Sequence, residues 1–294
     1  MRNALSVDVE EWFQVGALER VIRPDDWDAL ESRVARNTGI VLDLFAETGV
    51  KATFFTLGWV AARQPALVRR IVAAGHEIAS HGWDHARIFT LTPESFRADI
   101  IRAKSAIEDA AGVAVTGYRA PSFSLDARSA WAHRVLAEEG YGYSSSVAPI
   151  AHDHYGWPEA PRFAHRPLAD SALVELPVTT AHLGSKRFAA GGGGFFRLYP
   201  YRLSRWAIRQ VNRDDARPAV FYFHPWEVDP GQPYVREASL KSRLRHYSRL
   251  GAMAGKLRRL IGDFGWTRVD AVVAAEAVRL PAIDAPAREA VSAE

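Results

Sequence analysis

The chain has 294 residues, of which 48% are hydrophobic and 24% are charged, so it is long and apolar enough to bury a sizeable core. Its net charge of +3 is a mild excess, and we expect no nucleic-acid partner on this ground. Cysteine is absent, which excludes disulfide bonds and thiolate ligands and leaves His, Asp and Glu to hold any metal.

The N-terminal residues MRNALSVDVEEW become acidic at Asp8 and lack the apolar stretch of a secretory signal. The longest apolar runs elsewhere, such as AVFYF (219–223), are far shorter than a membrane span. With the absence of cysteine, these features predict a cytoplasmic protein without a transmembrane segment. Peripheral contact with a membrane stays open, and the sequence indicates no oligomeric state.

The first half of the chain alternates buried strands with amphipathic helices. Helix 92–112 has a well-marked start, with Thr92 as N-cap and Pro93 at the first helical position, and it stops at Gly112. Repeated alternation with short connections predicts a parallel α/β barrel whose polar loops lie at the C-terminal ends of the strands. We predict strands at 3–10, 51–58, 76–81, 114–121 and 143–149, and helices at 33–49, 66–75, 92–112 and 126–141.

The second half is less regular. AGGGGFFRLYPY (190–201) lacks the lysine and Ser/Thr of a phosphate-binding loop, so the four glycines favour a flexible loop or a close backbone approach. RPAVFYFHPWEVDP (217–230) predicts another strand with a polar end. We predict one domain over 1–280 with a basic C-terminal helical extension at about 235–265 and a disordered tail at 281–294.

Polar residues gather where the predicted strands end. In a parallel barrel these ends meet at one mouth, so side chains that are distant in sequence are brought together. The motifs are SVDVEEW with Asp8, Glu10 and Glu11, SHGWDH with His81 and His85, GYRAPSF with Arg119, and FYFHPWE with His224.

This set of residue types suits a catalytic metal site. Two histidines at i and i+4 bind one metal if the backbone between them makes a helical turn, and a carboxylate completes a three-ligand set with open positions. Asp8 and Glu10 lie on the same face of an ideal strand while Glu11 points away, which favours Glu10 as the third ligand. An isolated HxxxH is a weak signal, and the joint placement of the four motifs carries the prediction.

Together the motifs SVDVEEWF, SHGWDH, GYRAPSFS, GGGGFFRLYPY and FYFHPWE resemble those of polysaccharide deacetylases with the NodB homology domain, carbohydrate esterase family 4. The resemblance covers about residues 3–270 and is strongest to the exosortase-associated (PEP-CTERM locus) deacetylases of exopolysaccharide gene clusters. It implies a distorted (β/α)7-type barrel of the glycoside hydrolase–deacetylase kind. It also implies removal of N-acetyl groups from hexosamine polymers with a divalent metal, most commonly Zn²⁺.

The resemblance implies a role for each matching residue. In the implied amide hydrolysis the base activates water, a backbone N–H stabilises the oxyanion and an acid protonates the leaving amine. The implied roles are Asp8 as base, Arg119 as the residue that orients it, His224 as acid, the N–H of Ser122 as oxyanion donor, and Glu10, His81 and His85 as metal ligands.

The sequence departs from the common family pattern in two places. Most relatives have two adjacent aspartates, whereas Val9 separates Asp8 from Glu10 here, a spacing that one branch of the family shares. Ser122 stands where many relatives have tyrosine, and a backbone donor survives that change. The usual carboxylate partner of the acid histidine has no clear match, and Asp153 and Glu175 are candidates.

These features predict a deacetylase acting on an N-acetylated polysaccharide or a lipid-linked oligosaccharide precursor in exopolysaccharide biosynthesis. Two alternatives remain at this point. One is a hydrolase of a small cyclic amide, similar to allantoinase, on the same fold. The other is a carbohydrate-binding protein with an inactive site. A complete set of acid, base and ligands argues against both.

Overall fold

The computed structural model describes residues 1–152 and 155–281 of the chain. Eight strands form a parallel sheet in which β10, β1, β2, β3, β4, β5 and β6 follow one another and β9 also pairs with β1. They are β1 (Asn3–Val9), β2 (Thr53–Thr56), β3 (Glu77–Ser80), β4 (Gly117–Tyr118), β5 (Tyr143–Ser144), β6 (Val174–Glu175), β9 (Val220–Phe223) and β10 (Trp266–Thr267).

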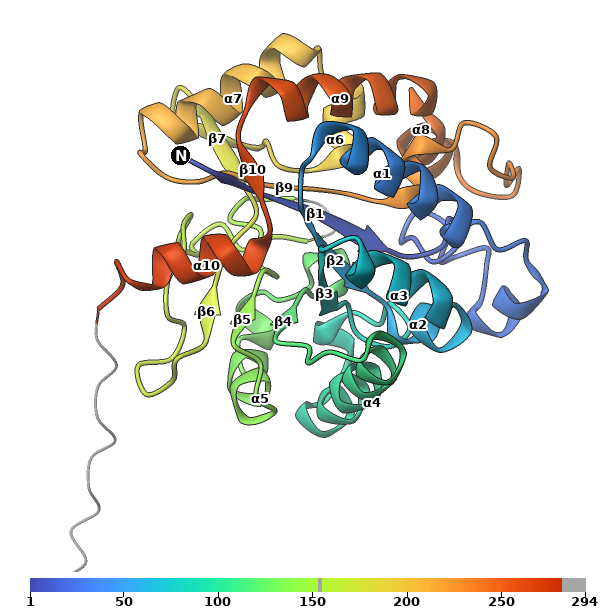
Figure 1. The fold of residues 1–294 in the computed structure, drawn as a ribbon, viewed down its shortest axis with the longest axis horizontal. Coiled ribbons are helices and arrows are strands. Elements are labelled where there is room, and N and C mark those ends of the chain that lie inside the picture. Colours follow the sequence, from blue (N-terminus) through green and yellow to red (C-terminus); the bar gives the residue numbers. More distant parts are fainter. Residues whose placement is uncertain (153–154, 282–294) are drawn as a thin grey trace, which may run out of the picture.

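Helices surround these strands on the outside (Figure 1). Parallel strands need long return connections, and the helices that provide them also cover the outer face of the sheet. The helices of the described chain are α1 (Val34–Thr48), α2 (Gly58–Arg63), α3 (Pro65–Ala73), α4 (Pro93–Ala111), α5 (Ala132–Glu138), α6 (Gly193–Leu198), α7 (Tyr201–Arg213), α8 (Leu240–Tyr247), α9 (Met253–Asp263) and α10 (Val269–Ala277).

The ring is incomplete between β6 and β9, where the chain around Gly191 takes the place of a regular strand. The N–H of Tyr222 on β9 donates to the carbonyl of Gly191 at 2.7 Å, and Gly192 forms an isolated parallel bridge with Tyr222. A separate antiparallel hairpin, β7 (Thr180–Leu183) and β8 (Lys186–Ala189), precedes this segment. The result is a distorted rather than a regular barrel.

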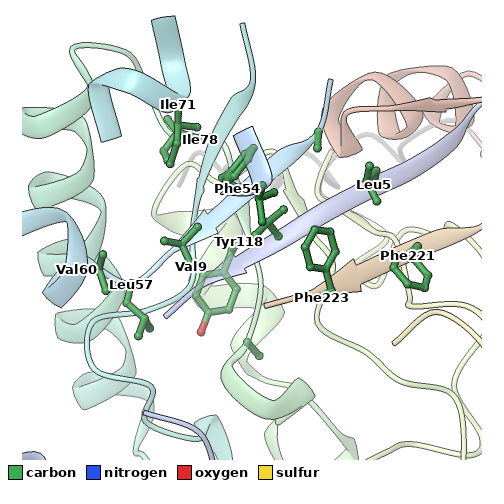
Figure 2. Packing of buried hydrophobic residues seen from close by; sticks show 14 of the residues in the cluster. Leu5, Val9, Phe54, Leu57, Val60, Ile71, Ile78, Tyr118, Phe221 and Phe223 are labelled. Carbon is green, nitrogen blue, oxygen red and sulfur yellow. The ribbon is translucent and has the colours of Figure 1, made fainter. Parts of the chain in front are cut away.

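The two faces of each strand have different partners. Leu5 and Val9 of β1 face the helices and share a buried cluster with Phe54 and Phe221, whereas Phe55 belongs to a second cluster on the other face of the sheet. Figure 2 shows Phe54, Ile78 and Ile71 gathered between the strands and α3. By the same alternation, Asp8 faces away from the helix layer.

Two predicted helices are interrupted in the structure. Within the predicted helix 126–141, Asp126 caps only a short 3-10 turn, since Ser129 hydrogen-bonds back to the Asp126 N–H, and α5 begins three residues later. The basic helical extension predicted at about 235–265 splits into α8 and α9 because Arg249 adopts a left-handed conformation, with φ of 56°. In the described part of the chain, no helix combines the length and apolarity needed to cross a bilayer.

We expect Phe54→Ala to lower the free energy of unfolding by about 3–5 kcal/mol, because the ring is fully buried and the substitution leaves a cavity. Its ring packs 6.0 Å from that of Phe45, measured between centroids. Urea unfolding measures the change. Ile101→Ala serves as the control, since Ile101 is 47% exposed and its loss should cost no more than about 0.5 kcal/mol.

Candidate active site

Asp8 and Arg119 form a buried ion pair inside the barrel. Arg119 follows β4, and its Nη1 donates to Asp8 Oδ1 and to Ser6 Oγ, each at 2.7 Å. Its Nε donates to the Ser145 carbonyl at 3.0 Å, and its guanidinium lies 4.1 Å from the ring centroid of Phe55. With every side of the guanidinium held, Arg119 fixes the orientation of the Asp8 carboxylate.

Glu10, His81 and His85 come together beside this pair at the ends of β1 and β3. One ligand atom from each lies within 4.8 Å of the other two. His81 Nδ1 donates to the Arg119 carbonyl at 2.9 Å, so its Nε2 keeps a free lone pair. The sequence motifs therefore meet in space as predicted, although the role of each residue as a ligand stays a prediction.

The three side chains fit a divalent cation. Glu10 Oε2 is buried and lies 2.9 Å from His85 Nε2, yet no donor in the described chain reaches it with hydrogen-bond geometry. A buried carboxylate oxygen without a donor is costly, and a cation relieves that cost. Two imidazoles and one carboxylate are the ligands that zinc and similar ions accept.

The backbone between the two histidines differs from the expected helical turn. It forms a bend in which Gly82 has φ of 78° and His85 has φ of 67°, both in the left-handed region. Asp99 of α4 accepts the Trp83 N–H at 3.2 Å and so fixes the bend from outside. The strained conformation of His85 brings the second imidazole toward Glu10 without a helix.

Glu11 lies away from this group. Its carboxylate accepts the Ser32 hydroxyl and the Arg33 N–H, the latter at 2.9 Å, just before α1 begins. Glu10 and Glu11 therefore have different neighbours, as the ideal strand predicts, although β1 itself ends at Val9. A carboxylate at a helix N-terminus has a structural function of its own, since it satisfies an otherwise unpaired amide.

His224 follows β9, and its carboxylate partner is Glu227. Glu227 Oε2 accepts the His224 backbone N–H at 2.9 Å and lies 3.2 Å from His224 Nδ1. The predicted partner Glu175 is wrong, because its carboxylate pairs with His133 Nε2 at 3.2 Å instead. The other candidate, Asp153, lies outside the described residues. In the sequence, the i, i+3 spacing of His224 and Glu227 within HPWE indicates this pairing, because one 3-10 turn places both side chains together.

Trp226 contributes to the site in a way that sequence reasoning missed. Its Nε1 donates to Glu10 Oε1 at 3.1 Å, and its ring stacks on His224 with centroids 5.1 Å apart. The indole is buried, so it holds the carboxylate of Glu10 from behind. Residues that orient metal ligands in this way commonly affect metal affinity.

Ser122 has an unusual backbone conformation. Ser122 and Phe123 both have positive φ, 53° and 49°. The N–H groups of Phe123 and Ser124 donate to the carbonyls of Ala120 and Pro121, whereas none of the described residues accepts the Ser122 N–H. An amide without a partner at a strained turn is suited to an oxyanion, and the predicted role of Ser122 stays a prediction.

The charges in the site favour distinct protonation states. Burial alone would raise the pKa of Glu10, but His85, His224 and His81 together lower it to about 2. Burial lowers the pKa of His81 to about 4, which keeps its imidazole neutral. Burial would also lower the pKa of His224, but Glu10 and Glu227 raise it to about 9. Neutral His81 suits a ligand, and protonated His224 suits an acid.

Comparison with known proteins identifies the family to which the chain belongs. A family model described as polysaccharide deacetylase matches residues 25–141, and one described as a domain of unknown function (DUF3473) matches residues 145–274. The chain is 33% identical over 185 residues to the chitooligosaccharide deacetylase of Bradyrhizobium sp. (strain ANU 289), covering 63% of this chain and 75% of that one. The chain belongs to the polysaccharide deacetylase family. This confirms the family inferred from the motifs, while the association with exosortase loci stays a prediction.

A second relative in this family matches over a shorter region. The chain is 36% identical over 81 residues to the peptidoglycan-N-acetylglucosamine deacetylase PgdA of Listeria monocytogenes serotype 1/2a (strain 10403S). That match covers 28% of this chain and only 17% of the relative. The two relatives act on different carbohydrates, so membership of the polysaccharide deacetylase family leaves the substrate open.

Solved structures agree on the fold of this family member. A provisionally assigned polysaccharide deacetylase from Mycobacterium smegmatis superposes with a TM-score of 0.62 at 21% identity, covering 96% of this chain and 92% of that one. Puue allantoinase superposes with a TM-score of 0.60 at 15% identity, covering 94% and 89%. At such identities the likeness concerns the fold, and it confirms the predicted α/β barrel.

Proposed function

We propose that the protein is a metal-dependent deacetylase that hydrolyses the N-acetyl groups of N-acetylhexosamine units in a polysaccharide or its precursor. The observation that carries this proposal is the convergence of three groups around one point of the barrel. These are the Asp8–Arg119 pair, the Glu10, His81 and His85 set, and the His224–Glu227 pair. Membership of the polysaccharide deacetylase family supports the same chemistry.

The side chains divide the reaction between them. Asp8 accepts a proton from the attacking water as the C–O bond forms, and the Ser122 N–H donates to the resulting oxyanion. The C–N bond then breaks while His224 donates its proton to the amine nitrogen. The products are acetate and a free amino sugar, so the hydrolysis consumes one water for each acetamide.

Glu10, His81 and His85 would hold the metal. A divalent cation bound there would polarise the acetamide carbonyl and lower the pKa of water at the site. We propose Zn²⁺ as this ion, because nitrogen and carboxylate ligands in a three-residue set suit it. Trp226 keeps Glu10 in position by its hydrogen bond to the carboxylate.

Acetate release from N-acetylglucosamine oligomers tests the proposal. We expect release by the purified protein, its loss after treatment with a chelator, and its return on addition of Zn²⁺. Allantoin is the comparison substrate, because Puue allantoinase has a similar fold. Turnover of allantoin without acetate release, or acetate release that resists complete metal removal, would contradict the proposal.

We further propose that the natural substrate is a precursor of an exopolysaccharide, free or lipid-linked, met in the cytoplasm. The absence of cysteine from the chain is consistent with a reducing compartment. Fractionation of cells that produce the tagged full-length chain, followed by activity assays on each fraction, tests the location. Activity confined to an extracytoplasmic fraction would contradict it.

A further inference from the structure

The glycine-rich segment singled out in the sequence lies against the acid histidine's partner. A Cβ atom on Gly193 would stand 2.1 Å from Glu227 Oε2, and one on Gly192 would stand 2.8 Å from the Tyr222 hydroxyl. Only glycine permits such an approach. The backbone at the start of α6 therefore presses directly on β9 and on Glu227, and the close-approach interpretation of the glycine run is the correct one.

Arg197 continues this contact one helical turn later, on the same face of α6 as Gly193. Its side chain is buried, and its Nε donates to Glu227 Oε1 at 2.8 Å. Its other nitrogens donate to three backbone carbonyls near the end of α8: those of Arg245 at 3.0 Å, His246 at 3.0 Å and Ser248 at 2.6 Å. Four hydrogen bonds leave the guanidinium a single position.

Glu227 divides its two oxygens between Arg197 and His224. Oε1 accepts from Arg197, while Oε2 accepts the His224 N–H and faces Nδ1 of the same imidazole. A proton on Nδ1 directed at Glu227 leaves Nε2 to face the site, where it lies 3.6 Å from Glu10 Oε1. The direction of the imidazole thus depends on where Glu227 is held.

We propose that Arg197 is a positioning residue for the acid histidine. It fixes Glu227 in place, and Glu227 accepts the Nδ1 proton of His224 and so fixes the direction of the imidazole, with Nε2 presenting its proton to the leaving amine. This inference rests on the proposed deacetylase function. It also gives a part in the reaction to the region matched by the domain of unknown function, residues 145–274, which contains all three side chains.

Electrostatics support the same arrangement. Burial would raise the pKa of Glu227, and Arg197 is the strongest of the influences that lower it below its usual range. Without the guanidinium, a carboxylate that is fully buried would lose its main cationic partner and tend to take up a proton. A protonated Glu227 no longer accepts the Nδ1 proton, so His224 would be free to turn or change tautomer.

The test compares Arg197→Gln and Arg197→Lys with Lys256→Gln. Lys256 is a matched control, because its Nζ donates to the carbonyls of Phe196, Arg197 and Tyr199 and so supports the same helix without touching Glu227. Each variant is assayed on an N-acetylglucosamine oligomer and on 4-nitrophenyl acetate. The phenolate of the ester leaves without a proton, so only the amide reaction needs the acid.

For Arg197→Gln we expect kcat on the amide to fall about 10–100-fold with KM nearly unchanged, and ester hydrolysis to fall less than about threefold. Arg197→Lys keeps the charge but not the fork of donors, so its amide kcat should lie between wild type and Arg197→Gln. Lys256→Gln should keep the wild-type ratio of amide to ester activity. Equal losses on both substrates, or no loss on the amide, would overturn the proposal.

A spectroscopic measurement separates this inference from the proposed function. The ¹⁵N shifts of His224, recorded at a pH high enough to leave the imidazole with a single proton, report which ring nitrogen carries that proton, whether or not the protein turns over any substrate. We expect protonated Nδ1 in wild type and in Lys256→Gln, and a mixture in Arg197→Gln. If Arg197→Gln does not fold, Arg197→Lys gives the same comparison. Unchanged shifts in an Arg197 variant that folds would contradict the positioning role. A lack of acetate release by wild type would contradict only the proposed function.

Discussion

Asp8→Asn is expected to lower kcat for acetate release by about 10³-fold, because asparagine cannot accept the proton of the attacking water. The size and shape of the side chain are kept, so binding of the oligomer and of the metal should change little. Steady-state kinetics with an N-acetylglucosamine oligomer measure the loss in kcat and KM separately.

The same substitution should also reduce stability, so the control variant must lose an ion pair as well. Arg119 is fully buried, and without Asp8 its charge has no anionic partner, a change that costs about 3–5 kcal/mol in comparable cases. Asp229→Asn removes the carboxylate from an ion pair in which Asp229 is buried and its partner Arg33, 2.9 Å away, is partly buried. This pair has no place in the proposed reaction. The Asp229→Asn variant should lose stability but keep kcat within about tenfold. An Asp8→Asn variant that keeps wild-type kcat would rule out Asp8 as the base.

His81→Ala is expected to remove the metal and the activity together. Wild type should carry about one divalent ion for each chain, since the three ligand residues form one set. With only one histidine and Glu10 left, the variant should retain almost none after dialysis. Mass spectrometry of the dialysed proteins gives the metal content, and acetate release is assayed on the same samples.

His133→Ala is the matched control for this experiment. His133 is buried and pairs with the carboxylate of Glu175, much as His81 is buried near Asp8 and Glu10. His133 lies outside the proposed ligand set. Its removal should leave the metal content unchanged, whatever it costs in stability. A full complement of metal in His81→Ala would refute the ligand assignment and direct the search to other donors.

Local patterns in the sequence were sufficient for most of the first half of the barrel, with the helix predicted at 126–141 as an exception. Thr92, Pro93 and Gly112 mark the ends of α4, and the structure has the cap at Thr92 and the left-handed residue at Gly112. The alternation along SVDVEE placed Asp8 and Glu10 on one face, because the period of a strand is two residues wherever it stays regular. Such features depend on neighbours within a few positions.

The supporting residues of the site could not be predicted in this way. The contact of Arg197 with Glu227 joins positions 30 residues apart, and that of Trp226 with Glu10 joins positions 216 apart. No periodicity connects them, since the first pair meets through the packing of α6 against β9 and the second through the pairing of β9 with β1. The bend at Gly82 also lay beyond pattern reasoning, because its left-handed residues include a histidine, which rarely adopts that conformation.

The place of β1 in the sheet has a consequence for how the protein is made. β1 pairs with β2 at once, but it also pairs with β9 and, through Asn3 and Ala4, with Trp266 and Thr267 of β10. During synthesis on a ribosome, β1 therefore lacks its partners β9 and β10 until more than two hundred further residues have emerged. One edge of β1 stays exposed until then. Such long-range pairing slows folding. Because Asp8 lies on this strand and His224 follows β9, the nascent chain acquires the complete set of proposed catalytic residues only after position 224 of 294 has been synthesised.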